Sequence, residues 1–285
     1  MSSKVAIVTD STAGIPANLM EGLPIYTLPL QVIWGETIYQ DGIDITPAEF
    51  YQALANAKVM PSTSQVTPIA FIKLYEQLLS EGYEILNILI SAKLSGTIDS
   101  ATQAKAHFPG ATIEIFDSKA ASMALGFQVL YAARMVKDGA SLKEVLQAIE
   151  KLPEKSGATF VVDTLEFLHR GGRIGGAAAF LGNAFDLKPI LELRDGRIEA
   201  AEKVRTKKKA ILRTIQLVQR KLDGYEKVHL ACLNANAPTE AQMLLDEVCK
   251  TLSDQCIFET VAADVSPVIG THTGPGTVGL AYMFE

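Results

Sequence analysis

The sequence is poor in cysteine and has no recognisable metal-binding pattern. Its 285 residues include three cysteines, at positions 232, 249 and 256, and no two of them have the C-x-x-C spacing. The four histidines, at positions 107, 169, 229 and 272, show no H-x-x-x-H spacing. An odd number of unclustered cysteines is typical of reduced thiols. We therefore expect neither a disulfide framework nor a metal or other cofactor.

Basic residues are also few, 26 against 32 acidic ones, which gives a formal net charge of −6. Nonspecific nucleic-acid binding needs a basic surface, so this balance argues against it. One basic run, Arg205-Thr-Lys-Lys-Lys209, lies at the expected start of a helix. It is interpreted either as a solvated helix face or as a docking surface for an acidic partner protein.

Long uninterrupted apolar segments are missing. The most apolar stretch, residues 120–136, contains Gln128 and Arg134 and is too short and too polar to span a bilayer. The first residues are typical of a strand and lack the charged and apolar regions of a secretory signal. These features predict a soluble, cytoplasmic protein without stable membrane insertion.

Common catalytic signatures are lacking as well. The sequence has neither the G-x-S-x-G pattern of serine hydrolases nor a phosphate-binding P-loop. Gly274, Gly276 and Gly279 match G-x-G-x-x-G, but the residues that follow read as a strand, whereas a dinucleotide site requires a helix. We expect a tight loop presenting His272 here. No catalytic residue is assigned, although an enzyme remains the alternative.

The first half of the sequence alternates strands with helices. Strands are predicted at residues 5–8, 25–33, 85–90 and 113–116. Thr46-Pro-Ala-Glu49 is a capping box that opens a helix to about residue 57, and Thr67-Pro68 opens another to about residue 81. Further helices are expected from near Ser95 and over residues 119–137. This order implies a mostly parallel sheet flanked by helices.

The second half of the sequence has a different order of predicted strands and helices. Strands are predicted at residues 159–162, 190–193, 198–204, 228–233, 258–262 and 278–283, and Asp195-Gly196 indicates a hairpin. Helices are expected at about 206–222 and 238–252. The sequence thus predicts a two-domain α/β fold, with an N-terminal α/β domain at 1–154. The C-terminal domain, 155–285, is expected to be α+β with a mostly antiparallel sheet.

Polar residues follow the first strand and fill a later connection. Asp10-Ser11-Thr12 follows a strand directly, and ligands of open parallel sheets lie at the carboxyl ends of strands. Residues 61–68 include four hydroxyls that could bind an anion or a carboxyl head group. The alternatives are a turn with a helix cap for the first segment and a solvated linker for the second.

Two further segments have features of anion sites. Ser95 and Thr97 lie at an expected helix start, where free N–H groups and the helix dipole favour an anion, although Ser95 could be a simple N-cap. Arg173 lies between two Gly-Gly pairs, and its guanidinium could hold a carboxylate or phosphate with paired donors. A helix stop followed by a tight turn is the alternative.

Taken in order, five segments of the sequence resemble the bacterial DegV family. They are Asp10-Ser-Thr12, Thr63-Ser-Gln65, Leu94-Ser-Gly-Thr97, Leu165-Glu-Phe-Leu with Gly171-Gly-Arg-Ile174, and His272-Thr-Gly-Pro-Gly276. The resemblance covers essentially the whole chain. It departs mildly from the family pattern at Val66, where a proline is usual, and at Gly175-Gly-Ala.

The resemblance implies a DegV-like fold that holds a long-chain fatty acid, such as palmitate, in a buried tunnel between the two domains. Thr63 and Ser95 would bind its carboxyl group, Arg173 and His272 would flank it, and Ser11 and Thr97 would belong to the same site. It also implies that a fatty acid kinase receives the carboxyl group, in lipid transport or fatty acid metabolism. The alternative is an enzyme, either a phosphoryl transferase or an acyl hydrolase that uses Ser95.

The energetics of burial agree with this implication. A sixteen-carbon chain has about fourteen methylenes, each worth roughly 0.8 kcal/mol on burial, or about 11 kcal/mol before the cost of immobilising the ligand. Only an enclosed tunnel gains this energy, and a buried carboxylate must be hydrogen-bonded.

Overall fold

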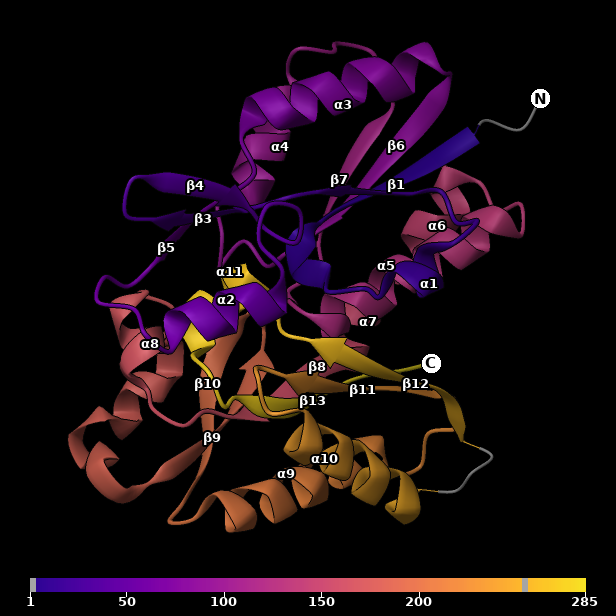
Figure 1. The fold of residues 1–285 in the computed structure, drawn as a ribbon. Helices are drawn as coiled ribbons and strands as arrows, with labels where there is room; N and C mark the ends of the chain where they lie inside the picture. The colour runs from indigo at the N-terminus through magenta and orange to yellow at the C-terminus, as the bar shows by residue number, and fades with distance from the viewer. Residues whose placement is uncertain (1–3, 253–255) are drawn as a thin grey trace.

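The first half of the chain folds around a four-stranded parallel sheet. The computed structural model, which describes residues 4–252 and 256–285, has the strand order β2-β1-β6-β7. Helices α3 and α4 cover one face of this sheet and α5 covers the other (Figure 1). The elements are β1 (Lys4–Asp10), the 3-10 helix η1 (Ser11–Ala13), α1 (Ala17–Met20), β2 (Ile25–Leu28), α2 (Pro47–Leu54), α3 (Pro68–Ser80), β6 (Tyr83–Leu89), α4 (Thr97–Lys105), β7 (Ile113–Asp117), α5 (Met123–Lys137), α6 (Leu142–Ile149) and α7 (Leu152–Lys155).

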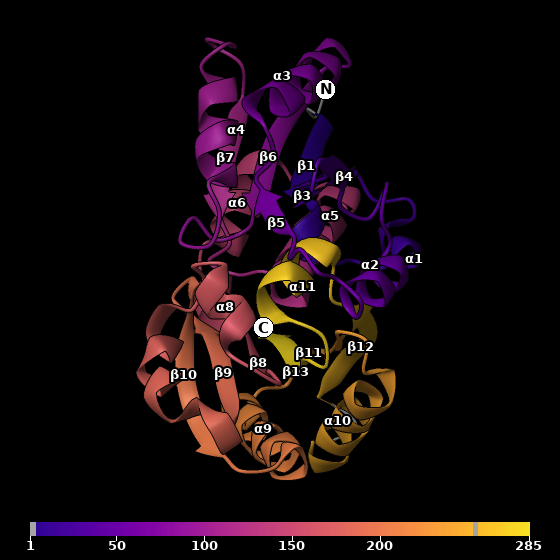
Figure 2. The ribbon, with the colours of Figure 1, turned by 60° about the vertical axis from the view of Figure 1, so that its left-hand side comes forward.

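The second half forms a six-stranded sheet in the order β10-β9-β8-β13-β11-β12. All neighbouring strands pair antiparallel except β11 and β12, which are parallel. Helices α9 and α10 cover the outer face (Figures 1 and 2). The elements are β8 (Ser156–Val161), α8 (Glu166–Arg170), the 3-10 helix η2 (Gly175–Asp186), β9 (Lys188–Arg194), β10 (Arg197–Val204), α9 (Lys207–Leu222), β11 (Val228–Asn234), α10 (Pro238–Thr251), β12 (Ile257–Asp264), α11 (Pro267–Thr273) and β13 (Val278–Phe284).

Helix α5 lies between the two sheets. It contacts β1 and β6 of the first sheet and β8 and β13 of the second. A helix covered on opposite sides must be apolar around its circumference, and most of the first three turns of α5 is buried. Within residues 4–252 and 256–285, no helix is both long and apolar enough to cross a bilayer.

The predicted fold class is confirmed, and several local signals hold. Thr46 forms the expected capping box with Glu49. Asp195 and Gly196 have φ values of 50° and 80° and join β9 to β10 as a hairpin. Two helix starts were predicted too early. The helix expected near Ser95 begins at Thr97 with Gly96 as its N-cap, and the helix expected from residue 119 begins at Met123.

A small third sheet was not predicted. Its strands, in the order β4-β3-β5, are β3 (Gln31–Trp34), β4 (Thr37–Gln40) and β5 (Ser62–Ser64). The single strand expected at residues 25–33 is wrong, because the chain leaves the parallel sheet at Pro29, which has no N–H to continue a ladder. The polar connection at residues 61–68 contains β5, which pairs with β3.

The prediction of a tight loop at His272 is also wrong. His272 lies in the last turn of α11, and the tight turn follows it at Gly274 and Gly276, whose φ values are 78° and 77°. Ser266 caps the start of α11 and Pro267 occupies its first turn, a combination that favours a helix. Helix α11 packs beside α8 and α2 (Figure 2).

Candidate functional site

A cavity of about 210 Å³ lies between the two halves of the molecule. Strands and loops of both halves contribute to its wall, which is mainly apolar. The apolar lining residues are Leu30, Ile90, Leu94, Ala121, Ala158, Phe160, Leu193, Ile198, Leu233, Val265, Val268 and Ile269. A cavity with this lining suits a hydrocarbon, because burying apolar surface is favourable and the wall requires few hydrogen bonds.

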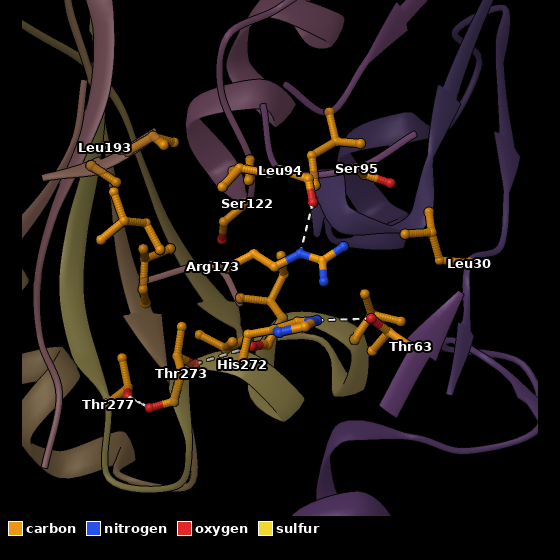
Figure 3. Close-up of a pocket in the computed structure, with 18 of the residues that line it drawn as sticks. Leu30, Thr63, Leu94, Ser95, Ser122, Arg173, Leu193, His272, Thr273 and Thr277 are labelled. Carbon is orange, nitrogen blue, oxygen red and sulfur yellow. Dashed lines mark hydrogen bonds between the residues drawn. The ribbon is translucent and has the colours of Figure 1, made fainter. Parts of the chain in front are cut away.

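Polar side chains gather in one part of this wall. Thr63 from β5, Ser95 from the turn before α4, Arg173 from the turn after α8 and His272 from α11 all line the cavity. Figure 3 shows the guanidinium of Arg173 pointing toward the side where Ser95 and Thr63 lie. Elements far apart in the sequence therefore bring together four of the six residues expected in the site.

The guanidinium of Arg173 is held by backbone carbonyls instead of a carboxylate. Its Nε donates to the Leu94 carbonyl over 3.0 Å and its Nη1 donates to the Gly171 carbonyl over 2.8 Å. No acidic side chain of residues 4–252 and 256–285 forms an ion pair with it. Because a half-buried cation is costly without a counter-charge, this geometry favours an anionic ligand.

His272 is a neutral hydrogen-bonding group at ordinary pH. Burial lowers its pKa to about 4, and the nearby charge of Arg173 adds to the effect. Its Nε2 lies 2.8 Å from the Thr63 hydroxyl, while its buried Nδ1 has no hydrogen-bond partner. The ring packs against the Cα of Gly171, where a Cβ would overlap Nδ1. A neutral imidazole at this place can orient Thr63 without adding a second positive charge.

Ser95 and Thr97 form a hydroxyl pair, with 2.9 Å between their oxygens. Ser95 lines the cavity, whereas Thr97 is fully buried behind it and is not a wall residue. Thr97 can therefore orient the Ser95 hydroxyl from behind.

Ser11, which was also expected in the site, does not line this cavity. Its hydroxyl donates to Asp41 over 2.7 Å and lines a separate acidic groove at the end of β1. Among the described residues, no cluster of three or more histidine, cysteine, aspartate or glutamate side chains could hold a metal ion.

A second groove lies directly outside the polar part of the cavity. Thr63, Arg173 and His272 line both spaces. The groove is completed by Met60, Pro61, Ser62, Phe167, Arg170, Gly171 and Thr271. The three shared side chains therefore separate the interior cavity from a surface that a macromolecule can approach.

The polar wall residues that were not assigned to the site from the sequence include Ser122 and Gln65. Ser122 precedes α5 with φ 54° and ψ −153°, a backbone conformation that is rare outside glycine, and its N–H donates to the Thr12 carbonyl over 2.8 Å. Gln65 lines the cavity and its amide donates to Ser100 over 3.0 Å. Ser122 follows the carboxyl end of β7 much as Ser95 follows β6, so the rule that identified Ser95 also applies to Ser122.

Comparison with known proteins gives a match over nearly the whole chain. The family model described as uncharacterised proteins of the DegV family matches residues 4–285. One solved structure shows the fatty acid binding of a DegV family protein from Thermus thermophilus. That protein is 37% identical to this chain with a TM-score of 0.93, and the match covers 99% of this chain and 100% of the other.

Two further solved structures are similar. DegV from Bacillus subtilis, a fatty acid binding protein, is 34% identical, with a TM-score of 0.88 and full coverage of both chains. A stearic acid-binding protein from Eubacterium ventriosum is 27% identical, with a TM-score of 0.90 and 98% coverage of each chain.

Proposed function

Because this chain belongs to the DegV family, we propose that it binds a long-chain fatty acid, such as palmitate, in the cavity between its two sheets. The observation that carries the proposal is the guanidinium of Arg173, which has no acidic partner in the described part of the chain and lines an apolar cavity. Similar structures of fatty acid-binding proteins support the same ligand class.

In this proposal the carboxylate lies among Thr63, Ser95 and Arg173. The two hydroxyls donate hydrogen bonds to the carboxylate oxygens, and Arg173 supplies the opposite charge through its remaining N–H groups. His272 orients Thr63 through their 2.8 Å contact, and Thr97 orients Ser95 in the same way. The hydrocarbon then extends along the apolar wall, where its burial supplies most of the binding energy.

We further propose that the bound carboxyl group is presented to a fatty acid kinase. The groove outside Thr63, Arg173 and His272 supports this role, because it lies next to the proposed carboxylate position. The chain would then act in lipid transport or fatty acid metabolism, in the cytoplasm, where such a kinase finds ATP. The proposed domain boundary, between 1–154 and 155–285, falls in the short helix α7, and residues of both proposed domains line the cavity.

The alternative is an acyl hydrolase, and the contacts favour binding over it. The Ser95 hydroxyl pairs with Thr97 and not with a histidine. His272 does face a hydroxyl, that of Thr63, but its low pKa makes it a weak base and its Nδ1 has no acidic group to orient it. We therefore propose that the chain alone carries out no chemistry on its ligand.

Calorimetric titration of the delipidated protein tests this proposal. Palmitate should bind at least tenfold more tightly than 1-hexadecanol, which has the same chain length but no negative charge for Arg173. Equal affinities would remove the proposed role of the polar wall. Incubation of the protein alone with ATP and palmitate, or with a palmitoyl ester, should give no product, and turnover in either reaction would support the enzyme.

A further inference from the structure

A buried carboxylate links the cavity wall to the end of the first strand. Asp41, in the turn after β4, is 2% exposed. One of its oxygens accepts a hydrogen bond from the Ser11 hydroxyl over 2.7 Å, and the other accepts from the N–H of Val268 over 3.2 Å. Val268 lies in the first turn of α11, so this single side chain joins η1 to α11.

The same pair also fixes a second piece of the wall. The N–H of Leu30 donates to the Ser11 oxygen over 3.1 Å, and the N–H of Asp41 donates to the Leu30 carbonyl over 2.9 Å. The backbone N–H and C=O of Leu30 are therefore both hydrogen-bonded to residues of the Ser11–Asp41 pair. The side chains of Leu30 and Val268 line the cavity, whereas Asp41 and Ser11 do not.

Helix α11 can transmit this constraint to the polar end of the site. Its seven residues begin at the Asp41 contact and end with His272 and Thr273, which line the cavity. A helix of this length is a rigid rod of about 10 Å, so a shift of its first turn moves His272 as well. The Tyr51 hydroxyl, which donates to the Val265 carbonyl over 3.0 Å, holds the preceding residues from the side of α2.

We infer that the Ser11–Asp41 pair is a positioning device for the ligand site, acting on Leu30 and, through α11, on His272. The pair touches no ligand. This inference rests on the proposed function for its effect on fatty acid binding, but its effect on the His272 ring can be measured without any ligand.

The test compares Asp41→Asn and Ser11→Ala with Asp44→Asn. Asp44 lies in the same turn and is exposed, and its carboxylate accepts a hydrogen bond from the Gln40 N–H within the turn. In the ligand-free protein, the imidazole nitrogen resonances of His272 should shift in Asp41→Asn and Ser11→Ala and stay in place in Asp44→Asn. Palmitate affinity should fall roughly tenfold in the first two variants and remain unchanged in the control.

A double-mutant cycle separates positioning from general destabilisation. The loss of palmitate affinity in Asp41→Asn combined with His272→Ala should be clearly smaller than the sum of the two single losses. Additive losses, or unaltered His272 resonances with wild-type affinity in folded variants, would overturn the inference. If Asp41→Asn does not fold, Ser11→Ala decides by the same criteria. Wild-type protein that fails to bind palmitate would contradict the proposed function alone, while the His272 resonances would still decide the inference.

Discussion

The hydroxyl groups of Thr63 and Ser95 line a mainly apolar cavity. Thr63→Val keeps the shape of the side chain and removes its hydroxyl, and Ser95→Ala removes the hydroxyl oxygen at the second position. Each loss of a hydrogen bond to a charged group, worth about 1.5–3 kcal/mol, should weaken palmitate binding roughly ten- to hundredfold in calorimetric titration.

The matched control is Thr102→Val. Thr102 is exposed on α4 and its hydroxyl donates to the Ile98 carbonyl of the same helix. Its palmitate affinity should equal that of the wild type. Unchanged affinity in both Thr63→Val and Ser95→Ala would mean that the carboxylate binds elsewhere in the cavity.

Arg173 should affect phosphoryl transfer more than it affects binding. In the proposed site the carboxylate would already have two hydroxyl donors, whereas phosphoryl transfer adds negative charge that a guanidinium stabilises with paired N–H groups. Arg173→Ala should therefore reduce acyl phosphate formation with a cognate fatty acid kinase by a larger factor than it reduces palmitate affinity. Arg220→Ala, an exposed substitution on α9, is the control for both assays.

Two outcomes would contradict this assignment. If affinity falls as far as the transfer rate, Arg173 is an ordinary carboxylate ligand. If neither quantity changes, the turn between the two glycine pairs is purely structural.

At the residue level, the segments that contain Thr63, Ser95, Arg173 and His272 stood out because their polar residues follow strands, open helices or lie in glycine-rich turns, and the family resemblance then selected these four residues for the proposed site. Ser11 had the same local signature, yet its hydroxyl bonds to Asp41, 30 positions further along the chain. Local pattern cannot distinguish these cases, because the direction of a side chain depends on tertiary partners. Thr97 was likewise expected to belong to the site, but it is buried and its hydroxyl pairs with that of Ser95.

The contact between α8 and α11 permits a test at the scale of elements. Gly171 ends α8 with φ −73°, a conformation that alanine adopts freely, so Gly171→Ala introduces no backbone strain. Its added Cβ would overlap His272 Nδ1, and the ring would have to move away from Thr63. We expect palmitate affinity to fall several-fold while the melting temperature changes little.

The His272→Ala background serves as the control for this steric effect. Without the imidazole ring, the extra methyl group has space, so Gly171→Ala should no longer reduce affinity. The same loss in both backgrounds would show that α8 acts independently of His272.

Among the elements, those with strong local signals were predicted well. The capping box at Thr46 and the Asp195-Gly196 hairpin each depend on residues within four positions of one another. The third sheet depends instead on β5 pairing with β3, about 30 positions away, through strands of three and four residues. Such short strands carry little periodicity, which explains why they were missed.

At the scale of the whole molecule, an ion pair joins α5 to the edge of the six-stranded sheet. Arg134 donates to both carboxylate oxygens of Glu259 over 2.7 and 2.8 Å, and His229 Nδ1 lies 2.7 Å from one of them. Burial alone would raise the pKa of Glu259, but the hydrogen bonds from Arg134 and His229 lower it to about 2. A folded-state pKa below the ordinary 4.5 stabilises the fold above pH 4.5, and this contribution is lost as the pH falls toward 2.

Glu259→Gln should therefore reduce the free energy of unfolding at pH 7 by about 1–3 kcal/mol, measured by urea denaturation. Its unfolding free energy should also fall less steeply than that of the wild type between pH 4.5 and the acid limit. Glu226→Gln, an exposed substitution before β11, should reproduce the wild-type curve. If the unfolding free energy of Glu259→Gln depends on pH in the same way as that of the wild type, ionisation of Glu259 does not contribute to the acid sensitivity of the fold.

The two halves of the molecule together enclose the proposed ligand, so the protein should retain it through purification. The most direct measurement is mass spectrometry of the lipid released by denaturing the purified, untreated protein. We predict a long-chain fatty acid with a free carboxyl group, in an amount comparable to that of the protein. Two results together would contradict fatty acid binding in this cavity. They are repeated preparations that release no fatty acid, and a melting temperature that does not rise when palmitate is added.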